Sequence, residues 1–274
     1  MKAHMVTGGG GIKLHVEETG NPNGRPMLFI HGFSQCRLAW TKQLTSDLAD
    51  EFRLVALDIR GHGLSEKPRD AYGDSQLWAQ DIQAVISTLG LDRPVLVGWS
   101  YGGVIICDYL RFYGEDRIGG INLVGAVTKL GSDEALAVIG AGLLTIAPGL
   151  FSNDVQESVR ALQAFIRMCV YAEPTLADFY FFLGYNTIVP PNVRQGLFSR
   201  TLNNDDLLPR IQRPVLITHG EEDALVLLEA PRQHAAAMPH AQMSWYPQVG
   251  HAPFWENATR FNRELREFAR AMGG

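Results

Sequence analysis

The sequence predicts an α/β fold, a doubly wound and mostly parallel sheet with an all-helical cap insertion. Short apolar runs alternate with helical patterns along most of the chain. The alternation fails between residues 128 and 208, where only helical patterns occur, and it resumes at Pro214. A serine flanked by glycines follows one apolar run directly and opens a helical pattern. Short apolar strands of this kind are typical of a parallel sheet that helices cover on both faces.

Each element follows from a local pattern. Apolar runs predict strands at residues 12–17, 27–30, 53–57, 94–97, 120–124, 214–218 and 243–246. Amphipathic spacing predicts helices at residues 40–48, 77–89, 101–113, 230–238 and 258–272, the second of them with Asp74 or Ser75 as its N-cap. We therefore predict a core made of residues 1–127 and 209–274 and a helical cap made of residues 128–208.

The composition excludes several classes of protein. The chain has 274 residues, of which 46% are hydrophobic and 19% charged, so it can form a real core and is not disordered. Its net charge of −5, without a run of basic residues, argues against a nucleic-acid partner. The cysteines Cys36, Cys107 and Cys169 are far apart, which disfavours a disulfide scaffold or zinc cluster and fits a reducing compartment.

No segment predicts a leader or a membrane span. The first eleven residues lack the apolar core of a signal peptide. The uncharged stretch of residues 135–153 approaches the length of a span, but glycines and Pro148 interrupt it. We therefore expect a cytoplasmic protein, and the sequence leaves its oligomeric state open.

The segment Gly98-Trp99-Ser100-Tyr101-Gly102 matches the G-x-S-x-G pattern of a nucleophile elbow. It lies between an apolar strand and an apolar helix, which is the context that lifts a serine hydroxyl above a sheet. The flanking glycines give the sharp turn room, because a Cβ would collide with neighbouring backbone. The pattern predicts that Ser100 is a nucleophile.

A nucleophilic serine needs a base, and the base needs a carboxylate that fixes its tautomer. His251 is the best candidate base, because it lies between the last predicted strand and the last predicted helix. Asp223 follows the preceding strand and gives the chain order Ser, Asp, His. Glu221 and Glu222 are adjacent alternatives for the acid. Asp133, the first carboxylate after the strand predicted at residues 120–124, is a further candidate.

An oxyanion hole needs two backbone N–H groups directed at the developing charge. Tyr101, the residue after the serine, is expected to supply one of them. Phe33, in the turn His31-Gly32-Phe33-Ser34 after the strand at 27–30, is expected to supply the other. The spacing of histidines and carboxylates indicates no metal site, and no G-x-G-x-x-G follows a strand, so no cofactor is expected.

These segments together resemble the α/β-hydrolase fold family. The resemblance rests on residues 31–33, 58–65, 98–103, 220–223 and 250–251, and it extends from about residue 12 to residue 268, weakest in the cap. The chain is most similar to the branch of serine esterases, lactonases and cofactor-free haloperoxidases with a helical cap. The resemblance supports Asp223 as the acid and implies that residues 58–65 form a structural turn beside the site.

The motifs predict a serine hydrolase that cleaves carboxylic esters through an acyl-enzyme intermediate. Family members that act on haloalkanes or epoxides use an aspartate at the elbow, where this chain has Ser100. Lactonase, perhydrolase and C–C bond hydrolase activities stay open as alternatives. A small-molecule receptor of the same fold with little turnover also stays open.

The cap is expected to select the substrate. Residues 135–153 and 179–193 contain no charged residue, and no cluster of Lys or Arg is placed to pair with an anion. We therefore expect a small, neutral and apolar ester as substrate, because burying an unpaired charge is costly. The side chains expected to bind it are Trp99, Phe151, Phe179, Phe182 and Phe254.

Overall fold

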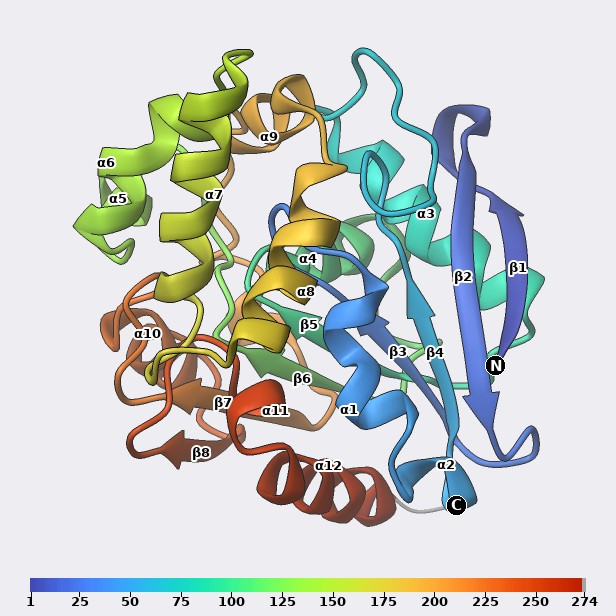
Figure 1. Ribbon diagram of the computed structural model, residues 1–274. Coiled ribbons are helices and arrows are strands. Elements are labelled where there is room, and N and C mark those ends of the chain that lie inside the picture. The colour runs from blue at the N-terminus through green and yellow to red at the C-terminus, as the bar shows by residue number, and fades with distance from the viewer. Residues whose placement is uncertain (273–274) are drawn as a thin grey trace.

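A single eight-stranded sheet forms the centre of the computed structural model, which describes residues 1–272 (Figure 1). Across the sheet the strands are β1 (Lys2–Thr7), β2 (Lys13–Gly20), β4 (Arg53–Leu57), β3 (Pro26–Ile30), β5 (Val95–Trp99), β6 (Gly120–Val124), β7 (Val215–Gly220) and β8 (Gln242–Tyr246). The pairs β1–β2 and β2–β4 are antiparallel, and all other pairs are parallel. The predicted mostly parallel α/β fold is confirmed.

Helices bury both faces of the sheet, which explains the apolar strands. In Figure 1, α1 (Thr41–Leu44) lies in front of the sheet, and α3 (Ser75–Thr88) and α4 (Tyr101–Tyr113) lie behind it. The face with α3 and α4 also receives α10 (Glu229–Ala237). The opposite face packs against α1, α2 (Leu48–Glu51), α11 (Pro253–Glu256) and α12 (Ala258–Ala271). As predicted, Asp74 caps α3, because its carboxylate accepts a hydrogen bond from Gln76 N.

The N-terminal segment differs from the prediction, because it forms the edge strand β1. Its side chains are mostly exposed, and Val6 alone in the strand is buried. A strand with one buried residue gives too little apolar alternation to be recognised from sequence.

The helix predicted at residues 40–48 is also different, because it is divided. A 3-10 turn (Arg37–Trp40) leads into α1, and α2 follows after a break. At the break, Thr45 Oγ1 donates to Thr41 O at 2.8 Å, and Ser46 Oγ donates to Gln43 O at 2.7 Å. Such local side-chain bonds compete with the helical pattern of the backbone.

Helices alone fill most of the chain between β6 and β7. They are α5 (Asp133–Leu136), α6 (Ala141–Leu150), α7 (Val155–Met168), α8 (Leu176–Thr187) and α9 (Pro191–Phe198). Figure 1 shows α5, α6 and α7 gathered at one side, with α9 beside them. We keep the name cap for residues 128–208, and this domain boundary stays a prediction. Within residues 1–272, no helix combines the length and apolarity that crossing a membrane requires.

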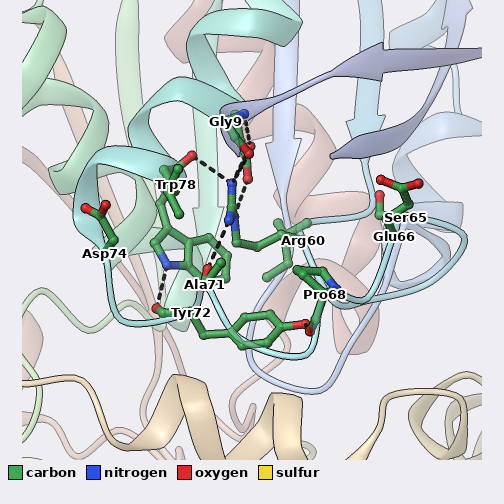
Figure 2. A network of polar contacts seen from close by, with 12 residues as sticks. Gly9, Arg60, Ser65, Glu66, Pro68, Ala71, Tyr72, Asp74 and Trp78 are labelled. Carbon is green, nitrogen blue, oxygen red and sulfur yellow. Dashed lines mark hydrogen bonds and ion pairs between the residues drawn. The ribbon is translucent and has the colours of Figure 1, made fainter. Parts of the chain in front are cut away.

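The turn at residues 58–65 is fixed by a buried arginine (Figure 2). Arg60 pairs with Asp81 of α3, at 2.7 Å from Nε to Oδ2 and 2.8 Å from Nη2 to Oδ1. Its guanidinium lies 5.4 Å from the ring of Trp78, whose Nε1 donates to Tyr72 O at 2.8 Å. Nη1 of the guanidinium donates to the backbone oxygen of Ala71, and Nη2 donates also to those of Gly9 and Leu77. The loop before α3 is thereby tied to the helix that packs behind the elbow.

Candidate active site

Ser100 lies in a tight turn between β5 and α4. Its φ of 55° and ψ of −115° are unusual for a residue with a side chain, and such conformations persist only where the surroundings enforce them. A Cβ at Gly102 would lie 2.5 Å from Ile30 O, so the turn requires glycine there. Ser100 N donates to Val124 O at 2.9 Å, and Ser100 O accepts from Val127 N at 3.1 Å. The elbow is therefore held between the ends of β3 and β6.

A buried His251–Asp223 pair follows the last two strands. His251 Nδ1 donates to Asp223 Oδ2 at 2.7 Å. The other carboxylate oxygen, Oδ1, accepts from the backbone N–H groups of Leu225 and Val226, both at 2.9 Å. Burial alone would raise the pKa of Asp223, but the charge and hydrogen bond of His251, with help from His219, hold it below its ordinary value. The carboxylate therefore stays ionised and orients the imidazole.

Two contacts bring this pair to the elbow. Trp99 Nε1 donates to His251 O at 2.8 Å, and the two rings lie 5.4 Å apart between centroids. A Cβ at Gly125 would lie 3.0 Å from His251 Nδ1, and the neighbouring Val124 accepts the hydrogen bond of Ser100 N. Within residues 1–272, neither Ser100 Oγ nor His251 Nε2 has a hydrogen-bond partner. Catalytic hydrogen bonds are often long without substrate and tighten when it binds.

Among the described residues, the competing carboxylates form no hydrogen bond or ion pair with His251. Glu221 and Glu222 are exposed, although they precede Asp223 directly. Asp133 is exposed at the start of α5. Of the four acids considered from sequence, Asp223 alone has a hydrogen bond to His251 among the described residues.

Two backbone N–H groups beside Ser100 are free to donate. Tyr101 is the first residue of α4, and the first N–H groups of a helix have no partner within it. The N–H of Phe33 likewise donates to no acceptor in the described part of the chain. Ser100, Tyr101 and Phe33 line the same cavity. This arrangement can stabilise an oxyanion formed at Ser100.

Two buried histidines hold the loop that carries Phe33. His31 Nδ1 donates to Gly32 O at 2.9 Å, and its Nε2 accepts from Ile59 N at 3.1 Å. His62 Nδ1 donates to Arg60 O at 2.9 Å, and its Nε2 accepts from Ser34 N at 3.2 Å. Each bond to Nε2 requires a neutral ring. Burial lowers the pKa of His31 to about 4 and that of His62 to about 3.

The cavity at Ser100 has a volume of about 250 Å³ and mostly apolar walls. The core supplies the loops at Phe33 and after Asp223, and the cap supplies side chains from α5, α6, α7 and α9. The cap and loop residues that line it include Leu130, Leu136, Ile139, Leu143, Phe165, Leu197, Phe198, Leu225 and Val226. Lys129 is the charged side chain in this wall, and its Nζ lies 2.8 Å from Asp205 Oδ2.

The five side chains expected to bind substrate lie outside this wall. Trp99 and Phe254 are buried under the elbow, with ring centroids 4.8 Å apart. Phe179 and Phe182 pack in a separate cluster of α8 with Tyr185. Phe151 packs against Phe198, which does line the cavity, at 5.3 Å between centroids. Phe182 also packs against Trp255 of the core, at 4.7 Å between centroids, so α8 uses these aromatic side chains to contact the core rather than the cavity at Ser100.

Sequence reasoning missed Lys129, Phe198, Leu225 and Val226. Leu225 and Val226 could have been found from their position, because residues two and three places after the acid must lie near the site. Lys129 and Phe198 give no such signal, since their orientation depends on how the cap packs. Among the described residues, no group of three His, Cys, Asp or Glu side chains is placed to hold a metal ion.

The sheet order and the serine elbow define the α/β hydrolases, and comparison with known proteins agrees. The chain belongs to this family, because residues 25–258 match the family model described as the alpha/beta hydrolase fold. The crystal structure of the esterase RhEst1 from Rhodococcus sp. ECU1013 is similar, with a TM-score of 0.95 and 36% identity over all of both chains. The bifunctional esterase/perhydrolase DCH of Acinetobacter calcoaceticus is 28% identical, covering 97% of this chain and 99% of that one. A non-heme haloperoxidase of Rhodococcus erythropolis is also 28% identical, covering 96% and 98%.

We call His31 and His62, which hold the loop of Phe33, the histidine brace. Because both rings must stay neutral, we predict that the free energy of unfolding decreases as the pH falls. In the folded state His62 stays neutral, whereas the unfolded chain binds a proton near pH 6.5. The unfolded state therefore gains protons first, and stability is full above about pH 6.5 and decreases as the pH falls toward the folded value. From pH 7 to pH 5, one such histidine costs about 2 kcal/mol of unfolding free energy.

We expect His62→Gln to lose less unfolding free energy than the wild type between pH 7 and pH 5, by the contribution of this one histidine, about 2 kcal/mol. Glutamine can accept from Ser34 N and donate to Arg60 O but does not titrate. Urea unfolding at pH 7 and pH 5 measures the difference, and His240→Gln, at an exposed histidine, is the control. Equal pH dependence in the wild type and in His62→Gln would contradict the neutral brace.

Proposed function

We propose that the protein hydrolyses carboxylic esters, with Ser100 as nucleophile, His251 as general base and Asp223 as the group that orients His251. The buried His251–Asp223 pair, held against the elbow by Trp99, is the observation that carries this proposal. The likeness to an esterase over the full chain and to a bifunctional esterase/perhydrolase supports acyl-group chemistry.

The reaction starts with attack of Ser100 Oγ on the ester carbonyl carbon. His251 Nε2 takes the hydroxyl proton, and the carbonyl oxygen becomes an oxyanion that the N–H groups of Phe33 and Tyr101 stabilise. When the tetrahedral intermediate collapses, His251 returns the proton to the leaving alcohol. Water then attacks the acyl-enzyme by the same route, and Ser100 is released with the carboxylic acid product.

The cavity supports small, neutral and apolar esters as the substrate class. Its walls are mostly aliphatic and aromatic, and the ammonium of Lys129 is already paired with Asp205. An anionic substrate would have to leave water without a free cation to meet it. The cavity volume of about 250 Å³ suits an acyl group of short to medium length or an aryl ester.

Removing the nucleophile or its supporting acid tests the proposal. We expect Ser100→Ala to lower kcat for a nitrophenyl ester by about 10⁴-fold or more, because only binding and oxyanion stabilisation remain. Asp223→Asn should lower kcat by a similar order, because the amide leaves His251 in the wrong tautomer. Steady-state hydrolysis assays measure both.

Asp133→Asn is the matched control for the acid, and we expect it to change kcat less than about twofold, since Asp133 does not contact His251. Near-normal turnover by Ser100→Ala would end the proposal. A severe Asp133→Asn variant together with a mild Asp223→Asn variant would show that the acid is assigned to the wrong residue. A burst of product followed by near-zero turnover in the wild type would favour a receptor over an enzyme.

The substrate class has its own test. For a neutral ester and its ω-carboxylate analogue at pH 7, we expect kcat/KM to be at least about 100-fold lower for the anion, because the cavity offers no free cation. Lys129→Met should leave kcat/KM for the neutral ester within a few fold. Equal turnover of the anion, lost in Lys129→Met, would identify Lys129 as an anion partner and contradict the apolar-cavity account.

A further inference from the structure

The side chain of Tyr101 is fixed to the cap. Its hydroxyl donates to Leu197 O in α9 at 3.3 Å. Arg200, just after α9, donates from Nη1 to the same hydroxyl at 3.1 Å. The residue that offers the N–H next to Ser100 is thus bonded, through its own side chain, to the end of α9.

Arg200 is itself held by a buried ion pair. Its Nη2 lies 2.7 Å from Asp108 Oδ2, and both side chains are almost fully buried, with 1% and 3% exposed. The same Nη2 donates to Ser75 Oγ at 2.9 Å. Its guanidinium lies 5.5 Å from the ring of Trp78, the ring that Arg60 covers at 5.4 Å (Figure 2). The core therefore fixes Arg200 on several sides, and Arg200 fixes Tyr101.

The second oxyanion donor meets the same segment of the cap. The ring of Phe33 lies edge-on to Phe198, at 6.3 Å between centroids, and to Phe165 of α7, at 5.9 Å. Leu197, Phe198 and Arg200 are nearly consecutive. One short stretch at and just after the end of α9 therefore contacts both residues that we propose as oxyanion-hole donors.

We propose that residues 197–200, at and just after the end of α9, are a positioning element for the oxyanion hole, with Arg200 as the positioning residue that holds Tyr101. This inference rests on the proposed function and deepens it. Arg200 is not among the residues that line the cavity, so in this proposal it acts on the rate through the placement of a backbone donor. The cap then contributes to the chemical step as well as to substrate selection.

The experiment uses two variants that leave both N–H donors in the chain. Tyr101→Phe removes the hydroxyl that forms hydrogen bonds with Leu197 O and Arg200. Arg200→Lys keeps a cation beside Asp108 but removes the second guanidinium nitrogen, which donates to the Tyr101 hydroxyl. Losing a whole oxyanion donor costs 10²–10³ in kcat, so we expect a displaced donor to cost about tenfold in each variant. KM for a neutral nitrophenyl ester should stay within about twofold.

A trifluoromethyl ketone reports on the oxyanion directly. Ser100 Oγ adds to its carbonyl carbon, the hydroxyl proton goes to His251, and the carbonyl electron pair becomes an alkoxide at the oxyanion hole. We expect its inhibition constant to rise about tenfold in Tyr101→Phe and in Arg200→Lys, in parallel with kcat. The double variant should lose no more than either single one, because both changes break the same link.

Tyr109→Phe is the matched control. Tyr109 lies on the same helix and is buried, and its hydroxyl has no hydrogen-bond partner within the described residues. We expect its kcat and inhibition constant to equal those of the wild type. If Tyr101→Phe had the same kcat and the same inhibition constant as Tyr109→Phe, even with a lowered Tm, the proposal would be overturned. The Tyr101 hydroxyl would then contribute to stability only. If the ketone did not inhibit the wild type and Ser100→Ala stayed active, the proposed function itself would fail.

Discussion

The turn at Ser100 is the constraint on which the rest of the site depends. The serine has a φ of 55°, and the turn fits only because glycine at position 102 lets α4 approach the end of β3. Hydrogen bonds to Val124 and from Val127 fix the turn to the end of β6 and to the loop that follows it. Trp99, one residue earlier, holds the backbone of His251. A strained turn in one loop thereby orders the loops after β6 and β8 around it.

Most of the sheet could be predicted from sequence, because strands that are buried on both faces consist of short runs of apolar residues. The strands expected at residues 27–30, 53–57 and 120–124 agree with β3, β4 and β6 to within one residue. The edge strand β1 was missed because pairing with β2 satisfies its backbone while most of its side chains face solvent. The divided helix near Thr45 shows that amphipathic spacing does not reveal local bonds from hydroxyls to the backbone.

In the site, the sequence predicted which residues would meet at one edge of the sheet, because loops after parallel strands converge there. None of the aromatic side chains expected to bind substrate lines the cavity at Ser100, and their contact with substrate stays a prediction. Periodicity shows that a cap helix has an apolar face but not which neighbour that face packs against. Arg200 illustrates this limit. From sequence, a charged residue in the cap is expected to face solvent or to bind an anion, but Arg200 is buried, pairs with Asp108 and donates a hydrogen bond to Tyr101.

The nucleophile at the elbow is the central claim, and covalent labelling tests it most directly. The protein would be treated with a nitrophenyl alkylphosphonate. The activated serine oxygen bonds to phosphorus, its proton goes to His251, and the phosphorus–oxygen bond to nitrophenolate breaks, so the phosphonyl group stays on the serine. Intact mass spectrometry should show one phosphonyl group per chain, peptide mapping should locate it on Ser100, and Ser100→Ala should stay unlabelled. Label on another residue, or equal labelling of the Ser100→Ala variant, would contradict the account.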